Sequence, residues 1–351
     1  MRRWARVQAP SNIALIKYMG KVDATKNLPA NPSISLTLDS LCTLTEVELV
    51  SERSEPFDLE WQGVTEIEGR ALRPLDLREK DRPKMLAHFR RIFEHFQQPL
   101  VGRWKVRTGN AFPAGAGIAS SASGFAALTL AIASVLKKGR DAPSASTCQD
   151  SWAALSRQGS GSSCRSFGGP WVLWEGERTS VLESNFEPLS DLVILIEEKE
   201  KAVSSTDAHR RVLSSPLWEG RVARVHARLQ RLRSVLISGN WQQFSTLAWE
   251  EAMDMHELFH TAEPSFSFWQ PQTREVLAWL ESLGVRTGQD GANAVKAAVT
   301  LDAGPNIHLL IPQCDEARWL ERLQKRFPEF TILVDRQGMG ARCLALGEEI
   351  S

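Results

Sequence analysis

The first fifty residues alternate between apolar and polar side chains. W-A-R-V-Q-A-P begins at Trp4, and S-I-S-L-T-L and L-C-T-L-T-E-V-E-L-V follow between residues 33 and 50. Because successive side chains of a strand point to opposite faces, this alternation predicts β-strands across residues 4–50. Lys17 and Lys21 stand between the strands, around a glycine and before a turn-rich segment, which predicts a polar loop. A surface hairpin with solvated lysines fits the same pattern.

Helical spacing begins at Asp81, where Met85, His88, Phe89 and Ile92 fall on one face. Further helices are predicted after Ser120 and over residues 149–156, 219–260 (as two amphipathic helices), 272–283 and 315–327. Strands are predicted over residues 104–107, 170–175, 192–197, 296–301, 307–311, 331–334 and 343–346. Residues 51–75 are charged and irregular, so no element is predicted there. A change of composition near Leu192 predicts a domain boundary, with domains at 1–190 and 191–351.

A small-residue segment from Asn110 to about Lys138 opens with Gly, Ala and Ser and continues as an apolar helix. Gly115 and Gly117 would let the backbone approach a ligand closely, and the serines that follow favour a helix start. The N-terminus of that helix would attract an anion such as polyphosphate. Two other interpretations stay open: a membrane-spanning helix, since no charge occurs from Ala114 to Leu136, and a buried helix whose small residues permit close packing. The segment lacks the lysine of a Walker A loop.

Composition limits the function classes. The 351 residues include 42 Lys and Arg against 42 Asp and Glu, so the net charge is zero. That balance argues against a nucleic-acid-binding surface and gives no electrostatic reason for membrane attachment. The N-terminus has no signal-peptide pattern. Five cysteines without metal-ligand spacing predict reduced thiols in a cytoplasmic protein.

A second Gly- and Ser-rich segment, G-S-G-S-S-C-R, begins at Gly159 and ends at Arg165, just before the apolar strand P-W-V-L-W-E. A flexible loop of this kind can wrap an anion with backbone N–H groups and hydroxyls. Arg165 would add a planar, bidentate clamp for a carboxylate or phosphate. A plain flexible linker has the same composition.

His256-Glu257-Leu258-Phe259-His260 matches the H-E-x-x-H pattern of zinc hydrolases, with Glu257 as the base. A catalytic zinc would also need a third ligand, for which Glu275 and Glu281 are the nearby candidates. Pro264 ends this helix soon after His260. A structural or surface pair of histidines is therefore favoured, and the zinc hydrolase is retained as the alternative from another enzyme class.

Five blocks of sequence, in order, resemble the diphosphomevalonate decarboxylase family of the GHMP kinase superfamily. The blocks are N-I-A-L-I-K-Y-M-G-K-V-D with N-L-P-A-N-P-S-I-S-L-T-L, P-A-G-A-G-I-A-S-S-A-S-G-F-A-A-L, G-S-G-S-S-C-R-S, V-S-S-T-D and T-L-D-A-G-P-N. They span almost the whole chain. Met19 stands where the family usually has Trp, the loop after Arg165 is one residue shorter, and residues 263–266 replace a common Pro-Pro pair.

The resemblance implies an α+β fold of the GHMP kinase type, with a ribosomal-protein-S5-like N-terminal half, a ferredoxin-like C-terminal half and the site between them. It implies a soluble, cytoplasmic homodimer that uses ATP and Mg²⁺. The implied reaction phosphorylates the tertiary 3-hydroxyl of (R)-5-diphosphomevalonate and then loses phosphate and CO₂ to form isopentenyl diphosphate. A relative acting on mevalonate or its monophosphate, or a kinase that stops before decarboxylation, is the alternative within the class.

The resemblance also implies roles for individual residues. Asp302 would accept the hydroxyl proton, Lys17 would keep Asp302 ionised, and Arg165 would hold the substrate carboxylate. The other residues implied to bind substrate are Tyr18, Met19, Gly20, Lys21, Lys84, Ser160, Gly161, Ser162, Ser163, Cys164 and Thr206. Those implied to bind ATP are Pro113, Gly115, Gly117, Ala119, Ser120, Ser121 and Ser123, with Ser120 and Ser121 as metal ligands. Retention of Asp302, Lys17 and Arg165 together favours the full decarboxylation over the alternatives within the class. A non-catalytic binding protein would be expected to lose at least one of these three charged residues, and none is missing.

Overall fold

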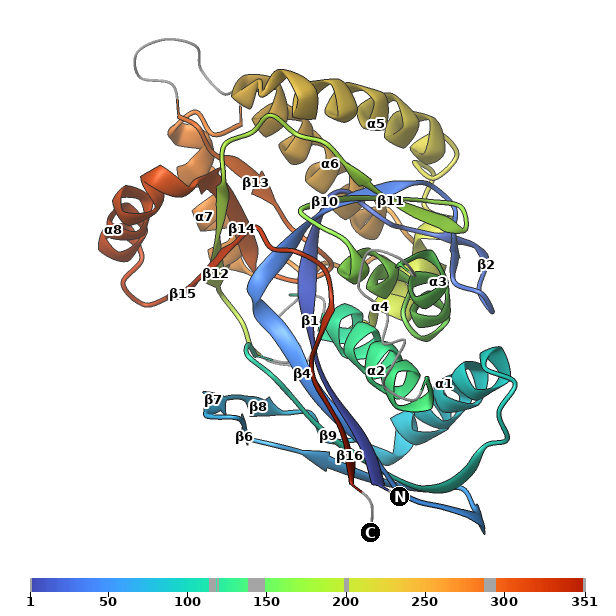
Figure 1. The fold of residues 1–351 in the computed structure, drawn as a ribbon. Helices are drawn as coiled ribbons and strands as arrows, with labels where there is room; N and C mark the ends of the chain where they lie inside the picture. The colour runs from blue at the N-terminus through green and yellow to red at the C-terminus, as the bar shows by residue number, and fades with distance from the viewer. Residues whose placement is uncertain are drawn as a thin grey trace.

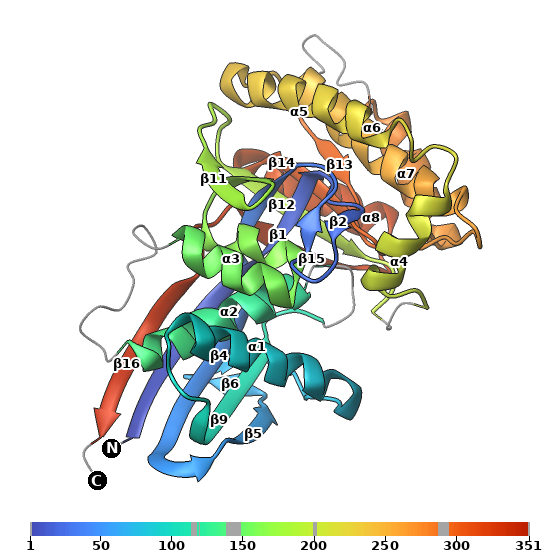
Figure 2. The same ribbon diagram turned by 90° about the vertical axis from the view of Figure 1, so that its right-hand side faces the viewer.

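The computed structural model describes residues 2–113, 118, 120–137, 149–198, 202–286 and 295–349. Figures 1 and 2 show a large sheet with helices on one face and a second, smaller sheet with its own helices beside it.

Two long strands, β1 (Arg2–Ile16) and β4 (Ser33–Pro56), form the centre of the large sheet and pair antiparallel along most of their length. The other strands of this sheet are β5 (Asp58–Gly63), β8 (Arg73–Pro74), β9 (Val101–Asn110), β10 (Trp171–Glu175), β11 (Arg178–Leu182) and β16 (Arg342–Glu349). Strand β16 pairs with β1, which brings the two ends of the described chain side by side (Figure 1). The hairpins β2–β3 (Lys21–Asp23, Leu28–Pro29) and β6–β7 (Glu66–Ile67, Arg70–Ala71) each form a separate two-stranded sheet.

The small sheet is antiparallel, in the order β13 (Ala298–Thr300), β14 (Ile307–Pro312), β12 (Leu189–Leu195) and β15 (Thr331–Arg336). Helices α1 (Arg82–His95), α2 (Ser120–Leu136) and α3 (Gln149–Gly159) cover one face of the large sheet (Figure 2). The second half of the chain adds α4 (Ser205–Arg211), α5 (Arg221–Ser238), α6 (Trp241–His260), α7 (Pro271–Ser282) and α8 (Glu316–Arg326). Short 3-10 turns are η1 (Glu79–Asp81), η2 (Gly161–Phe167), η3 (Val212–Ser214) and η4 (Gln313–Asp315).

One apolar core joins the two sheets. Ile13 and Leu36 of the large sheet pack in the same buried cluster as Val193 of the small sheet, Leu229 of α5 and Phe244 of α6. Burial of apolar surface is the main favourable term in folding, so this shared core fixes the second half of the chain against the end of β1. A separate cluster fills the space between the large sheet and α1–α3, and another lies between the small sheet and α7–α8.

Helices α5 and α6 form a tight antiparallel pair because of two residues between them. Gly239 ends α5 with φ of 65°, a left-handed conformation that glycine adopts without strain. Asn240 then begins α6, and its side chain accepts a hydrogen bond from the backbone N–H of Gln243. The turn sets the charged residues of α5 directly against those of α6.

Two expectations from the sequence are wrong. Residues 51–75 are not irregular, because β4 continues to Pro56 and β5 pairs in parallel with β9. Leu59 is buried and Trp61 is half-buried on one face of β5. The charged residues around them make the apolar–polar alternation of the strand hard to recognise in the sequence. The Gly- and Ser-rich segment before Arg165 is not a flexible loop, since Gly161–Phe167 form the buried turn η2.

The division at residue 190 stays a prediction. Strand β16 lies beyond that boundary in the sequence, yet it pairs with β1 in the large sheet. Among the described residues, no helix combines the length and the apolar character that a bilayer crossing requires.

Candidate active site

A cleft of about 640 Å³ opens where the end of β1, η2, α1, α4 and the loop after β13 meet. It brings together residues from all parts of the chain. The sequence-predicted residues that line it are Lys17, Tyr18, Met19, Lys21, Lys84, Ser121, Ser160, Gly161, Ser162, Arg165, Thr206 and Asp302.

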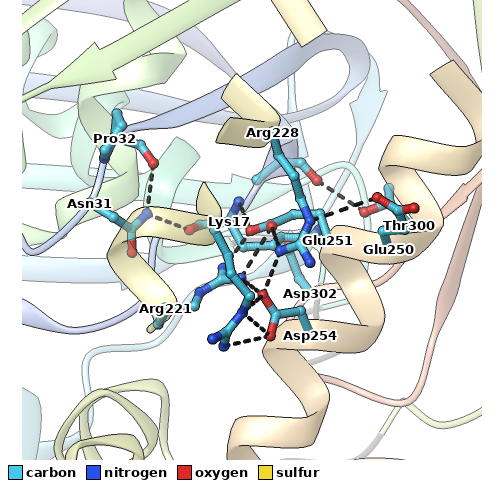
Figure 3. A network of polar contacts seen from close by, with 12 residues as sticks. Lys17, Asn31, Pro32, Arg221, Arg228, Glu250, Glu251, Asp254, Thr300 and Asp302 are labelled. Carbon is cyan, nitrogen blue, oxygen red and sulfur yellow. Dashed lines mark hydrogen bonds and ion pairs between the residues drawn. The ribbon is translucent and has the colours of Figure 1, made fainter. Parts of the chain in front are cut away.

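Lys17 and Asp302 are in direct contact in this cleft (Figure 3). The Lys17 Nζ lies 2.7 Å from the Asp302 Oδ1, although 285 positions separate the two residues in the sequence. The Lys17 side chain is 1% exposed and that of Asp302 is 23% exposed. Lys17 is therefore not a solvated lysine of a surface hairpin, and Asp302 keeps an edge open to the cleft.

Electrostatics favour the ionised carboxylate. Burial acts to raise the pKa of Asp302, but the charge of Lys17 and its hydrogen bond outweigh burial and hold the pKa below its usual range. His308 and Arg165 add smaller contributions in the same direction. Asp302 is thus a carboxylate at neutral pH, in the state that can accept a proton.

Arg165 is held by three polar side chains beneath the cleft. Its Nε donates to Ser35 Oγ at 3.1 Å, its Nη1 donates to Ser33 Oγ at 2.6 Å, and its Nη2 donates to Asn12 Oδ1 at 3.2 Å. The side chain is buried, and none of the described carboxylates forms an ion pair with it. Each terminal nitrogen carries two N–H groups and donates one of them here, so one N–H on each remains for another partner such as a carboxylate.

Positive charge dominates the cleft. Of the described residues that line it, the charged ones are Lys17, Lys21, Lys84, Arg91 and Arg165 against a single carboxylate, Asp302. Burial and the nearby charge of Lys84 lower the pKa of Lys21. A bound anion would relieve this crowding of like charges, so the cleft suits an anionic ligand that carries several charges.

The rim of the cleft holds hydroxyl groups from two segments. Ser121 lies in the first turn of α2, and its Oγ is 3.1 Å from the Oγ of Ser160. Gly161 approaches the Tyr18 ring so closely that a Cβ at this position would lie 2.7 Å from it. Tyr18 in turn packs on Trp174 and His209. This packing holds the Ser160–Ser162 segment against the cleft.

Several predicted residues do not line the cleft. Ser163 Oγ donates to the carbonyl of Ser160, and the Cys164 thiol donates to the carbonyl of Gly161, so both stabilise η2 from within. The Gly20 N–H donates to His209 Nδ1 at 3.0 Å. The remaining predicted residues away from the cleft lining are Pro113, Ser120 and Ser123, the last of which is buried beside Thr43. Gly115, Gly117 and Ala119 lie outside the described residues.

Sequence reasoning missed the side chains that hold Arg165. Ser33 and Ser35 alternate along β4 with Thr37, whose hydroxyl donates to the carbonyl of Gly168, and all three are fully buried. Hydroxyl residues at every second position of a predicted strand lie on one face, and buried polar groups need partners, so this alternation could have indicated a buried polar site.

His209 was missed as well, although it follows Thr206 by one helical turn on α4 and lines the cleft. Because its Nδ1 accepts from Gly20, its Nε2 carries the proton and is the donor.

A zinc site finds no support in the described part of the chain, where no cluster of three or more His, Cys, Asp or Glu side chains could hold a metal. His256 is fully buried against Phe259 and Trp269. His260 lies beside Glu257 and Ser267, and no third metal ligand lies near it among the residues that the structure describes. A Mg²⁺ ion fits differently, because it keeps several waters and takes most other ligands from phosphate oxygens. The hydroxyl of Ser121 at the cleft rim is compatible with that ligand set.

Comparison with known proteins identifies the family. Residues 9–184 match the family described as "Diphosphomevalonate decarboxylase-like N-terminal domain", and residues 191–345 match "Mevalonate 5-diphosphate decarboxylase C-terminal domain". The diphosphomevalonate decarboxylase of Candida albicans is 30% identical, over 92% of this chain and 88% of that protein.

Solved structures agree over nearly the full length. The mevalonate diphosphate decarboxylase of Legionella pneumophila is 36% identical, with a TM-score of 0.78, and the match covers 95% of this chain and 100% of that one. The enzyme of Enterococcus faecalis is 26% identical, with a TM-score of 0.80, over 98% of this chain and 99% of that one. A complex of "MDDEF" with MVAPP, AMPPCP and magnesium has a TM-score of 0.81 at 27% identity, over 98% and 99% of the two chains.

These matches confirm the resemblance found in the sequence and the predicted α+β fold of the GHMP kinase type. The chain belongs to the diphosphomevalonate decarboxylase family.

Proposed function

We propose that the chain catalyses the ATP-dependent decarboxylation of (R)-5-diphosphomevalonate, which yields isopentenyl diphosphate, ADP, phosphate and CO₂. One observation carries the proposal: a buried Lys17–Asp302 pair lies in a cleft whose other charged lining residues, among those described, are all cationic. Membership of the family and the complex of a related structure with MVAPP, AMPPCP and magnesium support it.

The first step needs a base, because a tertiary alcohol is a poor nucleophile. Asp302 is ionised, partly exposed to the cleft and held in place by Lys17, so it is the candidate to accept the proton of the 3-hydroxyl. The hydroxyl oxygen would then attack the γ-phosphorus of ATP, and ADP would leave. Lys17 would stabilise negative charge on the phosphoryl group during the transfer.

The second step breaks two bonds. The C3–O bond would break with both electrons on the departing phosphate, and the electrons of the C1–C2 bond would then form the new double bond as CO₂ leaves. Arg165 has one unused N–H group on each terminal nitrogen and no carboxylate partner among the described residues, so the substrate carboxylate would complete its pairing. The pairing would align C1–C2 for cleavage.

The remaining cleft residues would bind the phosphates. Lys21, Thr206 and the Nε2–H of His209 line the same region and would hold the 5-diphosphate, with Lys84 and Arg91 nearby. Ser121 and the start of α2 would hold the nucleotide phosphates. Mg²⁺, once bound, would neutralise charge on those phosphates. We also propose a cytoplasmic homodimer, as in the prediction from the sequence.

The substrate is tested by offering mevalonate, its 5-phosphate and its 5-diphosphate separately, with ATP and Mg²⁺. Release of ADP and CO₂ in equal amounts is expected with the 5-diphosphate, because the excess of positive charge in the cleft favours the most anionic substrate. Equal or higher kcat/KM for mevalonate or its monophosphate would point to the alternative within the class. ADP release without CO₂ would indicate a kinase.

Asp302→Asn tests the base. Asparagine has nearly the same shape and can still accept a hydrogen bond from Lys17, so the fold and the KM should change little. The kcat should fall about 10²–10⁴-fold, the usual contribution of a general base. A variant with near-normal kcat would remove Asp302 from the mechanism.

Arg165→Lys tests the carboxylate clamp. Lysine cannot reproduce the planar pair of hydrogen bonds, so KM should rise and kcat should fall. ADP and CO₂ release should fall together, because both steps need the same substrate pose. Arg157→Lys is the matched control, since Arg157 is also buried but donates to the carbonyl of Glu177 and does not line the cleft. If the Arg165 variant releases ADP at the normal rate but releases CO₂ late, then Arg165 does not position the substrate before phosphorylation.

A further inference from the structure

Lys17 is held by its backbone as well as by its ammonium group. The pairing of β1 with β4 ends at Ile16, so the peptide groups of Lys17 lie beyond the ladder. The Lys17 N–H donates to Glu251 Oε1 at 3.0 Å, and the Lys17 carbonyl accepts from Asn31 Nδ2 at 2.9 Å. Two side chains from distant segments thus clamp this one residue (Figure 3).

The same region ties the partner of Lys17 to β1. Thr300 Oγ1 donates to the carbonyl of Ala14 at 3.0 Å, and Asp302 follows Thr300 by two residues. The end of β13 is therefore fixed to the end of β1. Once the backbone of Lys17 is fixed too, the distance between Lys17 Nζ and Asp302 Oδ1 has little freedom to change.

Burial of the charged Glu251 side chain in this position costs free energy. It lies in the middle of α6, and its side chain and that of its partner Arg221 are both 0% exposed. Its Oε1 accepts from the Lys17 N–H and from Arg221 Nη2, while its Oε2 accepts from Arg221 Nη1 and from Arg228 Nη1. Every partner is a donor. Asp254, one turn further along α6, accepts from the same two arginines and from Arg224.

Burying such a network costs free energy that apolar side chains would not cost. Packing α5 against α6 does not require it, since Leu229 and Phe244 already pack in the shared apolar core. What the network adds is a carboxylate with a fixed position, aimed at the backbone of Lys17. Glu251 itself does not line the cleft.

We propose that Glu251 is a positioning residue: it fixes the backbone of Lys17 and so sets the contact between Lys17 and Asp302, without touching the substrate. The inference rests on the proposed function in one respect, which is that Lys17 and Asp302 take part in the proposed reaction.

Charged groups around Lys17 and Asp302 influence the pKa values of both residues, so the proposal can be tested by titration. The charged and titratable groups that face Lys17 or Asp302 are Glu251 and His256 of α6, Arg165 of η2 and His308 of β14. Burial lowers the pKa of Lys17, and the charges of Asp302 and Glu251 oppose that effect. Loss of the Glu251 charge should therefore deprotonate Lys17 at lower pH, and a displaced or neutral Lys17 should let the pKa of Asp302 rise.

Glu251→Gln is the decisive variant. The NH₂ group of glutamine would face only donors on either side, so the clamp on Lys17 should loosen. The kcat should fall by about 10²-fold, the effect of a displacement of about 1 Å in a catalytic group. KM should change much less. The bell-shaped pH profile of kcat should narrow from both sides, with its acidic limb at higher pH and its basic limb at lower pH.

Glu250→Gln is the matched control. Glu250 precedes Glu251 on the same helix and lies beside Arg228 and Arg231, but it is 42% exposed and makes no contact with Lys17 among the interactions described. Its kcat and pH profile should match those of the unmodified protein. A Glu251→Gln variant that unfolds at lower temperature yet keeps the normal kcat and pH profile would overturn the proposal, because Glu251 would then serve stability alone.

A second variant covers the case in which Glu251→Gln does not fold. Asn31→Ala removes the hydrogen bond to the Lys17 carbonyl and leaves the charged network intact, and Asn31 does not line the cleft. It should also lower kcat, and the acidic limb of the pH profile should move to higher pH, because a displaced Lys17 lets the pKa of Asp302 rise. The basic limb should move less than in Glu251→Gln, because the charge of Glu251 is still present. Normal values in Asn31→Ala would count against the clamp.

A readout without substrate separates this inference from the proposed function. The pKa of Asp302, followed by ¹³C NMR of labelled carboxyl groups, should rise in Glu251→Gln and stay constant in Glu250→Gln, whichever substrate the protein takes. An unmodified protein that releases no CO₂ from any mevalonate derivative would refute the proposed function alone. An Asp302 pKa that does not respond to Glu251→Gln would refute the positioning role alone.

Discussion

A buried ammonium group in contact with a carboxylate is stable only while both groups are held against each other, because each has lost most of its water. In this chain the contact between Lys17 and Asp302 joins the end of a strand in the large sheet to a loop of the small sheet. Its geometry therefore depends on how the two halves of the chain pack. The shared apolar core and the bond from Thr300 to Ala14 provide that packing.

The distribution of charge explains how a chain with no net charge can bind a polyanion. The 42 cationic and 42 anionic side chains cancel over the whole molecule, yet the described cleft residues include five cations and one carboxylate. Arg165 is the extreme case, since hydroxyl and amide oxygens hold it and none of the described carboxylates pairs with it. A cation that is buried but unneutralised favours the binding of an anionic ligand, and neutral partners leave its charge available for that ligand.

Periodicity in the sequence predicted most of the elements that carry the site, because strand alternation and helical spacing are local properties. The strands around Lys17, the helix after Ser120 and the amphipathic pair that contains Glu251 are in the structure. The ordered blocks of the family resemblance also named Lys17, Arg165 and Asp302, which the structure brings to one cleft. Their roles in catalysis remain proposals.

The supporting residues could not be read in the same way, because their partners are distant in the sequence. Asn12 and Ser35 hold Arg165 only through the register in which β1 pairs with β4, and Glu251 reaches Lys17 across 234 positions. The buried turn η2 was misjudged for a related reason: glycine and serine have no apolar surface of their own, so their burial comes from the residues packed around them.

The central claim is that Lys17 keeps Asp302 ionised as the base. It is tested most directly by ¹³C NMR titration of carboxyl-labelled protein without substrate, with Asp302 assigned by comparison with Asp302→Asn. The Asp302 signal should still report a carboxylate at pH about 3.9, where an unperturbed aspartate is half protonated. In Lys17→Met its pKa should rise, because burial then acts without the opposing charge. If Asp302 titrates at or above the ordinary aspartate pKa in the unmodified protein, or if its pKa is unaffected by Lys17→Met, then Lys17 does not keep Asp302 ionised.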